Sequence, residues 1–286
     1  MLNKNIVDYM GCDCTYEEAD IVLYGAPFDS TTSFRPGTRF AGGAIRTDSY
    51  GLETYSPYQD RSLEECRVFD MGDLELAIGS SEKVLDQIEE TAGEIFRDGK
   101  LPFLIGGEHL VTLGSVRAAA RKYPDLHILH FDAHTDLRED YLGVELSHAC
   151  VLRRCWELLG DGRIHQLGIR SGERAEFGWA REGHTDLHPF TLEGLGETLE
   201  ELKGVPVYFT VDLDVMDPSV FPGTGTPEPG GVSYMELQRA VTEVCRKAEV
   251  IGCDVTELSP PFDPTGASTA AACKIIREML IALGTK

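Results

Sequence analysis

The stretch HFDAHTD at positions 130–136 follows a short apolar run that begins at Leu126. The apolar run predicts a buried strand over 126–131, and open α/β sheets place their ligand sites just beyond the carboxyl ends of strands. In an extended backbone alternate side chains point to the same side, so Asp132, His134 and Asp136 would face one way. This pattern indicates a cation site. The alternative is an ordinary polar loop, in which Asp caps helices and His is half solvated.

Strands and helices are predicted to alternate along the rest of the chain. Apolar segments predict strands, and apolar residues spaced at i, i+3 and i+4 predict helices. The expected strands are 21–25, 68–71, 101–105, 126–131, 164–168, 205–211 and 250–255, and the expected helices are 42–50, 80–97, 112–122, 150–159, 171–181, 234–248 and 272–283. This alternation predicts a three-layer α/β/α fold with a mostly parallel sheet.

The organisation of the chain suggests one folding unit. We find no internal repeat, low-complexity tract or linker-like segment, so residues 1–286 are expected to form a single catalytic domain. Residues 182–204 show no readable periodicity, and their structure is left open.

The charge balance narrows the range of partners. The chain has 26 Lys and Arg against 48 Asp and Glu, a formal net charge of −22. Nucleic acids and anionic membranes are disfavoured, because their binding depends on basic side chains. A negative field can concentrate a cationic substrate, although acidic surfaces more often serve solubility. No apolar run is long enough for a membrane helix, and Met1–Asp20 lacks the features of a signal peptide, so a cytoplasmic location is expected.

The eight cysteines are expected to be reduced and mostly buried. Cys12 and Cys14 flank Asp13 and could suggest a thiolate metal site. No second cysteine pair with zinc-type spacing accompanies them, so a plain surface segment is favoured and their role stays open.

Three separate segments place acids or histidines where a predicted strand ends. They are GGEH at 106–109, which contains His109, then Asp132, His134 and Asp136, and finally Asp212 and Asp214 in VDLDVMDP. Carboxyl ends of parallel strands meet at one edge of a sheet, so two imidazoles and four carboxylates would gather there. That number of ligands indicates two divalent ions.

The ligand types favour manganese among the candidate metals. Cobalt, zinc, nickel or iron would also fit, because affinity order alone does not decide which ion is bound. A purely structural calcium or zinc site is the alternative. It is disfavoured because calcium avoids imidazole and structural zinc prefers four Cys or His ligands.

Several long motifs in a fixed order resemble those of the ureohydrolase family of arginases and agmatinases, and the agmatinase branch most closely. They span nearly the whole chain: GAPFDSTTSFRPGTRF at 25–40, DMGD at 70–73, GGEH at 106–109, FDAHTD at 131–136, SHA at 147–149, VDLDVMDPSVFPGTGTPEPGG at 211–231 and DVTELSPPFDP at 254–264. The resemblance implies the arginase/deacetylase-like α/β/α fold, two Mn²⁺ ions per subunit and a homo-oligomer, a trimer or hexamer.

The resemblance also implies a metal ligand set. His109 and Asp136 would hold one ion, and His134 and Asp214 the other. Asp132 and Asp212 would bridge the two ions. A water shared by the ions would become a hydroxide near neutral pH and act as the nucleophile.

Further residues are implied for substrate binding and catalysis. Glu257 would pair with the guanidinium group, since such a planar fork suits a carboxylate. Thr226 would add a polar contact near the reacting group. His148 would carry a proton to the departing amine, as imidazole titrates in the useful range. Asp136 could relay the first proton.

The segment between Asp136 and His148 bears on the substrate. It contains Glu139, Asp140 and Glu145, and this acidic character would repel an α-carboxylate and could hold an ammonium group. Glu145 is therefore a candidate for substrate binding. These residues favour cleavage of agmatine to putrescine and urea, which would place the enzyme in polyamine biosynthesis.

Other functions remain open on the sequence. Guanidinobutyrate, arginine or formiminoglutamate could be the substrate instead. From a different class, the chain could be a metal-binding scaffold without turnover, or a deacetylase of the same broad fold. The paired acidic motifs favour two metals over the single zinc that a deacetylase would use.

Overall fold

One parallel sheet runs through the part of the chain that the computed structural model describes, residues 7–284. Its strand order is β4-β1-β5-β10-β9-β6-β7-β8, and each of the neighbouring pairs is parallel. Its strands are β1 (Ile21–Gly25), β4 (Val68–Asp73), β5 (Leu101–Ile105), β6 (His127–Phe131), β7 (Ile164–Ile169), β8 (Asp186–Pro189), β9 (Pro206–Asp212) and β10 (Glu249–Thr256). The prediction of a parallel sheet is confirmed, and the ends of the expected domain, residues 1–6 and 285–286, lie outside the described residues.

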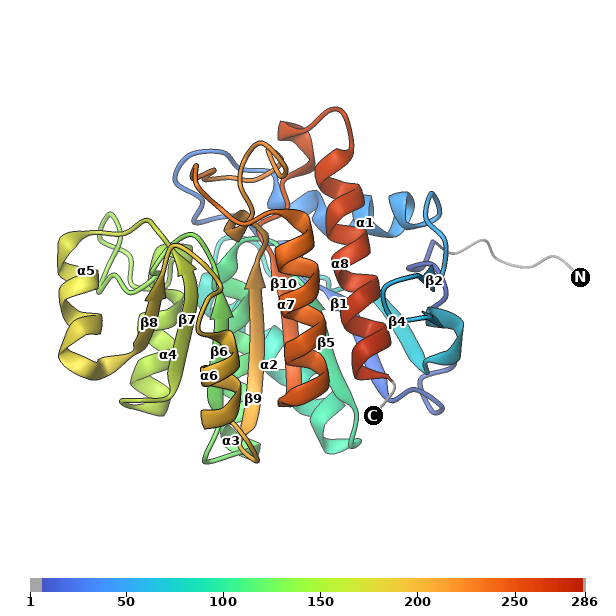
Figure 1. Ribbon diagram of the computed structural model, residues 1–286, viewed down its shortest axis with the longest axis horizontal. Helices are drawn as coiled ribbons and strands as arrows, with labels where there is room; N and C mark the ends of the chain where they lie inside the picture. Colours follow the sequence, from blue (N-terminus) through green and yellow to red (C-terminus); the bar gives the residue numbers. More distant parts are fainter. Residues whose placement is uncertain (1–6, 285–286) are drawn as a thin grey trace, which may run out of the picture.

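Helices cover both faces of this sheet and complete the three layers. They are α1 (Ala41–Ser49), α2 (Ser81–Arg97), α3 (Thr112–Lys122), α4 (Val151–Leu159), α5 (Arg174–Trp179), α6 (Leu195–Glu201), α7 (Tyr234–Lys247) and α8 (Ala267–Leu283). In Figure 1, α6, α7 and α8 lie in front of the strands and α2 and α3 behind them. Each face has its own apolar core, with Val241 and Ile276 in one and Ile88 and Val116 in the other. The α/β/α architecture is therefore as the sequence predicts.

Shorter elements lie mainly in the connections. β2 (Tyr55–Ser56) and β3 (Arg61–Ser62) form a two-stranded antiparallel hairpin. The 3₁₀ turns are Thr38–Phe40, Leu63–Glu65, His109–Val111, His148–Cys150, Leu213–Val215 and Pro260–Phe262, and Ala180–His184 forms a π-helical turn. Three of these turns begin at or next to a predicted site residue, and two of the three, His109–Val111 and Leu213–Val215, lie just beyond the ends of β5 and β9.

In residues 171–204 one predicted helix starts later than expected, and the segment whose structure was left open contains two elements. The helix expected over 171–181 begins only at Arg174, where Glu173 and Glu176 form a capping box, and it runs into the π-helical turn. The unreadable 182–204 contains edge strand β8 and helix α6. β8 is only partly buried and polar in sequence, and α6 spans seven residues, so neither shows the periodicity that predicts an element.

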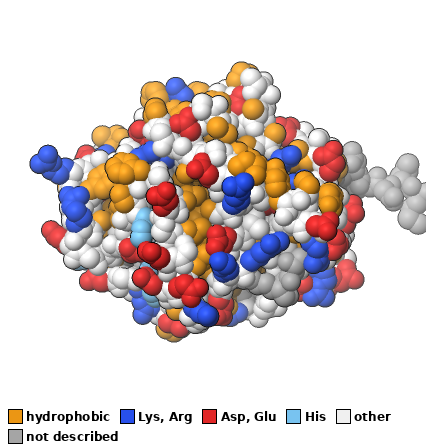
Figure 2. Space-filling model, viewed as in Figure 1, with side chains coloured by type: hydrophobic (Ala, Val, Ile, Leu, Met, Phe, Trp, Pro, Cys, Tyr) orange, Lys and Arg blue, Asp and Glu red, His pale blue; other side chains and the backbone are white. Residues whose placement is uncertain are grey.

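The surface agrees with the charge analysis. On the face drawn in Figure 2, Lys and Arg side chains are scattered among Asp and Glu and form no continuous basic patch. Among residues 7–284, no helix combines the length and apolar character needed to cross a bilayer. Seven of the eight cysteines are buried and Cys14 is half-buried. The groups of described side chains that could hold a metal include neither Cys12 nor Cys14.

Asp263 fixes the start of α8 and one wall of the loop that follows β9. Its Oδ2 accepts hydrogen bonds from the Ser268 backbone (2.7 Å) and hydroxyl (2.6 Å), and its Oδ1 accepts from the Thr265 backbone (3.1 Å) and hydroxyl. Ser268 Oγ in turn accepts from the Gly223 backbone at 2.9 Å. Burial opposes the charge, but these donors prevail and lower the pKa of Asp263 to about 2.

The variant Asp263→Asn is expected to lose about 1 kcal/mol of unfolding free energy at pH 7, as for loss of a helix cap. Because the folded pKa of about 2 lies below the ordinary 3.8, this stabilisation is complete above pH 4 and is lost as the pH falls through 2. Urea unfolding at pH 7 and pH 3 should show the wild-type advantage shrinking at pH 3. Exposed Asp48→Asn serves as the control, and an advantage of equal size at both pH values would contradict this account.

Candidate metal centre

His109 lies at the centre of a group of carboxylates at the carboxyl edge of the sheet. It opens the turn after β5, while Asp132 follows β6 and Asp212 ends β9. Its Nδ1 lies 3.1 Å from Asp132 Oδ2, 3.2 Å from Asp136 Oδ2 and 3.3 Å from Asp212 Oδ2. All four side chains are buried. The structure therefore brings together one imidazole and three acids that are separated by up to 103 positions in the numbering.

His134 forms a second centre beside the first. Its Nδ1 lies 3.0 Å from Asp214 Oδ2 and 3.5 Å from Asp132 Oδ1. Asp132 thus directs one carboxylate oxygen toward His109 and the other toward His134. A carboxylate in this position can bridge two cations.

Hydrogen bonds behind His109 determine which ring nitrogen is available to a metal. Its Nε2 lies 2.9 Å from Thr210 Oγ1, and the Thr210 hydroxyl donates to Asp254 Oδ1 at 2.5 Å. The Thr210 hydroxyl donates its only hydrogen to Asp254, so its oxygen accepts a hydrogen bond from Nε2–H of His109. In the neutral ring Nδ1 is then the nitrogen without a hydrogen, and it is directed at three carboxylate oxygens. This is the tautomer and the support that a metal-binding histidine requires.

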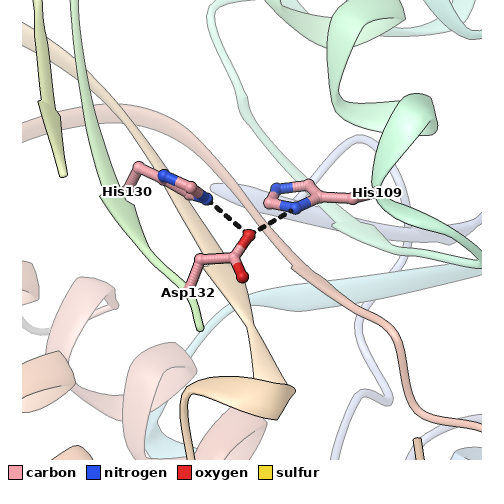
Figure 3. A group of neighbouring side chains, drawn as sticks. All are labelled: His109, His130 and Asp132. Carbon is pink, nitrogen blue, oxygen red and sulfur yellow. Dashed lines mark hydrogen bonds and ion pairs between the residues drawn. The ribbon is translucent and has the colours of Figure 1, made fainter. Parts of the chain in front are cut away.

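The same support is found behind Asp132 (Figure 3). The Gln166 amide donates to Thr135 O (2.8 Å) and to His130 Nδ1 (3.1 Å), so His130 carries its hydrogen on Nε2. That nitrogen lies 2.8 Å from Asp132 Oδ2, toward which His109 also points in Figure 3. His130 is therefore an outer residue that orients Asp132.

Unsatisfied atoms and charge indicate that this cluster fits cations. His109 Nδ1 and Asp214 Oδ2 are buried and have no hydrogen-bond partner, although carboxylate oxygens surround the first and His134 Nδ1 lies 3.0 Å from the second. Burial, followed by the charge of Asp132, raises the pKa of Asp136 to about 7, and burial with Asp214 and Asp132 raises the pKa of Asp212. Several buried carboxylates at this range can all be ionised together only with positive charge between them. Two divalent ions would supply +4 against four Asp.

The backbone from Asp132 to Asp136 does not have the extended conformation that was predicted from the sequence. The expectation of an extended chain through Asp136 is wrong, because β6 ends at Phe131 and the following segment is irregular. Asp136 has φ of 52°, in the left-handed region. Asp tolerates this conformation better than most residues, and the turn is what aims its carboxylate at His109.

Glu257 is tied to the loop that carries His109. It too has a left-handed backbone, with φ of 64°, and its N–H donates to Gly107 O at 3.0 Å. Its Oε1 accepts from the His109 backbone at 2.7 Å. Gly107 is required here, since a Cβ would lie 1.9 Å from Phe28 O. The strained Glu257 conformation is thus held from both sides next to the cluster.

A pocket of about 260 Å³ opens onto the cluster. It is lined by Ser33, His109, His134, Thr135, Asp136, Arg138, Tyr141, His148, Ala149, Ser171, Gly172, Glu173, Glu176, Asp212, Thr226 and Glu257. The predicted residues Glu257, His148 and Thr226 therefore share one cavity with four of the predicted metal ligands. Burial lowers the pKa of His148 to about 4, so its ring is neutral at pH 7.

Glu145 is not brought to this pocket. Its carboxylate lies 3.5 Å from Arg154 Nη1, and its side chain is 74% exposed. Residues 142–145 form an exposed turn outside the pocket lining, and a contact of Glu145 with substrate stays a prediction. Acids from a different segment, Glu173 and Glu176, take the place in the pocket wall.

Sequence reasoning did not single out Thr210, Asp254, Glu108 or Glu176. Thr210 and Asp254 are paired across β9 and β10, and both are fully buried. Each is a polar residue inside an otherwise apolar strand, and this contrast could have revealed them, because a buried polar group must find a hydrogen-bond partner. Glu176 lies in a segment with no such contrast.

Comparison with known proteins agrees with the geometry. The model of the arginase family matches residues 19–282. The agmatinase of Bacillus subtilis (strain 168) is 48% identical over 268 residues, covering 93% of this chain and 92% of that protein. The agmatinase of Bacillus anthracis is 46% identical over 269 residues, covering 93% of each.

A solved structure gives the same result for the fold. The agmatine ureohydrolase of Thermoplasma volcanium superimposes with a TM-score of 0.89 at 34% identity, covering 98% of this chain and 95% of that one. The match extends over the strand ends that carry the acidic cluster. The chain therefore belongs to the arginase family.

Proposed function

We propose that this chain is an agmatinase, a manganese-dependent ureohydrolase that converts agmatine to putrescine and urea. The observation that carries the proposal is Asp132, whose two oxygens face two different histidines at the base of an acidic pocket. The agmatinases at 46–48% identity support the choice of substrate.

Six residues would hold the two metal ions. His109 and Asp136 would bind one, His134 and Asp214 the other, with Asp132 and Asp212 between them. When bound, the ions lower the pKa of a water molecule by several units and so supply a nucleophile at neutral pH. Manganese is proposed because the donors are four carboxylates and two imidazoles.

The other pocket residues would bind the substrate and move protons. Glu257 would hold the guanidinium group against the cluster, with Thr226 contributing a polar contact from the opposite loop. Hydrolysis forms a carbon–oxygen bond and breaks the bond from carbon to the substituted nitrogen, which needs a proton as it leaves. Asp136 would accept the first proton, and His148, which lines the same pocket, would take up a proton and pass it to the departing nitrogen.

The pocket wall favours a substrate that is positive at both ends. Glu173 and Glu176 lie on it, and its basic lining residue, Arg138, is already paired with Glu173 at 2.7 Å and lies 3.8 Å from Glu176. A substrate carboxylate would therefore meet acids without a free cation. The ammonium of agmatine would be attracted instead.

With manganese present, agmatine is expected to give kcat/KM for urea release roughly 100-fold above arginine or guanidinobutyrate at matched concentration, since misplaced like charges cost several kcal/mol. A chelator should abolish the release and added manganese should restore it. If arginine were the best substrate, the assignment of the pocket wall would be wrong while the metal chemistry would stand.

Assembly and location are proposed on the same basis. A homo-oligomer, a trimer or hexamer, is supported by the family resemblance and by large exposed apolar side chains such as Ile78 and Leu142. A single catalytic domain is supported by the continuous sheet, and action in the cytoplasm is proposed with it.

A further inference from the structure

Glu108 is a fully buried acid next to the metal ligand His109, and its carboxylate faces away from the cluster into the loop after β1. Oε2 accepts from the Thr31 backbone (3.0 Å) and the Thr32 hydroxyl (3.0 Å), and Oε1 accepts from the Thr31 hydroxyl at 2.5 Å. The Glu108 N–H donates to Phe28 O at 2.8 Å. The GGEH segment is thus tied closely to residues 28–32.

Thr31 connects this buried acid to His148, 117 positions away in the numbering. A hydroxyl carries a single hydrogen, and that of Thr31 is held by Glu108. Its oxygen can therefore only accept, and it does so from the His148 backbone at 3.1 Å. The Nδ1 atom of the His148 ring lies 3.4 Å from the same oxygen.

An oxygen that can only accept favours the hydrogen on Nδ1 of the neutral ring. Nε2 is then left with a lone pair, on a ring that lines the pocket. Ser147 Oγ is also 3.4 Å from Nδ1, but its hydroxyl can donate or accept and so selects neither tautomer. The Tyr141 ring meets the imidazole edge to face, at 5.8 Å and 86°, and fixes the ring plane from the other side.

We infer that Thr31, held by Glu108, is a positioning residue that determines which ring nitrogen of His148 exchanges a proton with the substrate. The inference rests on the proposed function. It assigns Nε2 as the nitrogen that first takes up a proton and then passes it to the departing amine, and it gives the acid of GGEH a task separate from metal binding.

The test compares Thr31 variants in the manganese-loaded enzyme. Thr31→Val should lower kcat for urea release from agmatine roughly 10- to 100-fold, the size of a general acid–base contribution, with KM and bound manganese unchanged. Thr31→Ser keeps the accepting oxygen and should restore most of the activity. Thr32→Val, which loses a bond to Glu108 but does not touch His148, and Ser147→Ala should each change kcat less than about 3-fold, because neither removes that acceptor.

A double-mutant cycle separates positioning from a merely structural role. In a His148→Asn background, Thr31→Val should add less than about 2-fold, because it acts through a ring that is no longer there. An equal loss in both backgrounds, or no loss in the wild-type background, would overturn the inference. If circular dichroism shows that Thr31→Val does not fold, Thr31→Ala takes its place in the same double-mutant cycle. Absence of urea release by the wild type would overturn the proposed function instead.

Discussion

Asp132→Asn is expected to reduce urea release by at least about 10³-fold, the scale of losing electrostatic stabilisation and an activated water. Asp132 directs its two oxygens to His109 and His134, and an amide offers one neutral oxygen in place of a bridging carboxylate. We therefore expect bound manganese to fall from about two ions per chain toward one or none. Metal content after dialysis and steady-state urea release from agmatine would be measured on the same samples.

The matched control is Asp125→Asn, an exposed aspartate just before the opposite end of β6. It makes the same chemical change on the same segment without touching the cluster, and it should keep full activity and metal. Turnover that survived Asp132→Asn with two ions still bound would show that the bridge between the two centres is not made by this residue.

The second large effect is expected at Glu257. In the Glu257→Gln variant, the amide oxygen can still accept from the His109 backbone, a bond of 2.7 Å in the wild type, so the metal ligands should stay in place. The buried negative charge for the guanidinium is lost. Removing one partner of a buried charge pair costs about 2–5 kcal/mol, which corresponds to a fall in kcat/KM of roughly 30- to 4,000-fold.

Steady-state kinetics with agmatine and metal analysis would check this result. KM should rise and manganese content should stay at the wild-type value, whereas Asp132→Asn loses metal. The control is Glu139→Gln, an exposed acid that does not line the pocket, which should behave as wild type. A kcat/KM within about 3-fold of wild type for Glu257→Gln would contradict this assignment. So small a change is less than the loss of a buried charge pair would cause, and the guanidinium would then bind elsewhere.

Most of the fold could be predicted because the central strands are buried on both faces. Segments such as 205–211 and 250–255 are continuous apolar runs, which a parallel sheet covered by helices requires. β8 escaped prediction because an edge strand with partly exposed residues needs no apolar run. The convergence of the acids was predicted from an extended chain through Asp136, yet it is produced by a left-handed turn at that residue.

The sequence by itself determined the family, the layered fold and the identity of the acids and imidazoles at the strand ends. This was possible because each group of acids and imidazoles directly follows an apolar segment, a pattern that is visible in the sequence even though the three groups are far apart in the chain. Only the tertiary structure decided the pocket wall, where Glu173 and Glu176 replaced Glu145, and the supports at Thr210, Asp254 and Thr31. These residues act through contacts between distant segments, and such contacts leave no periodic trace along the chain.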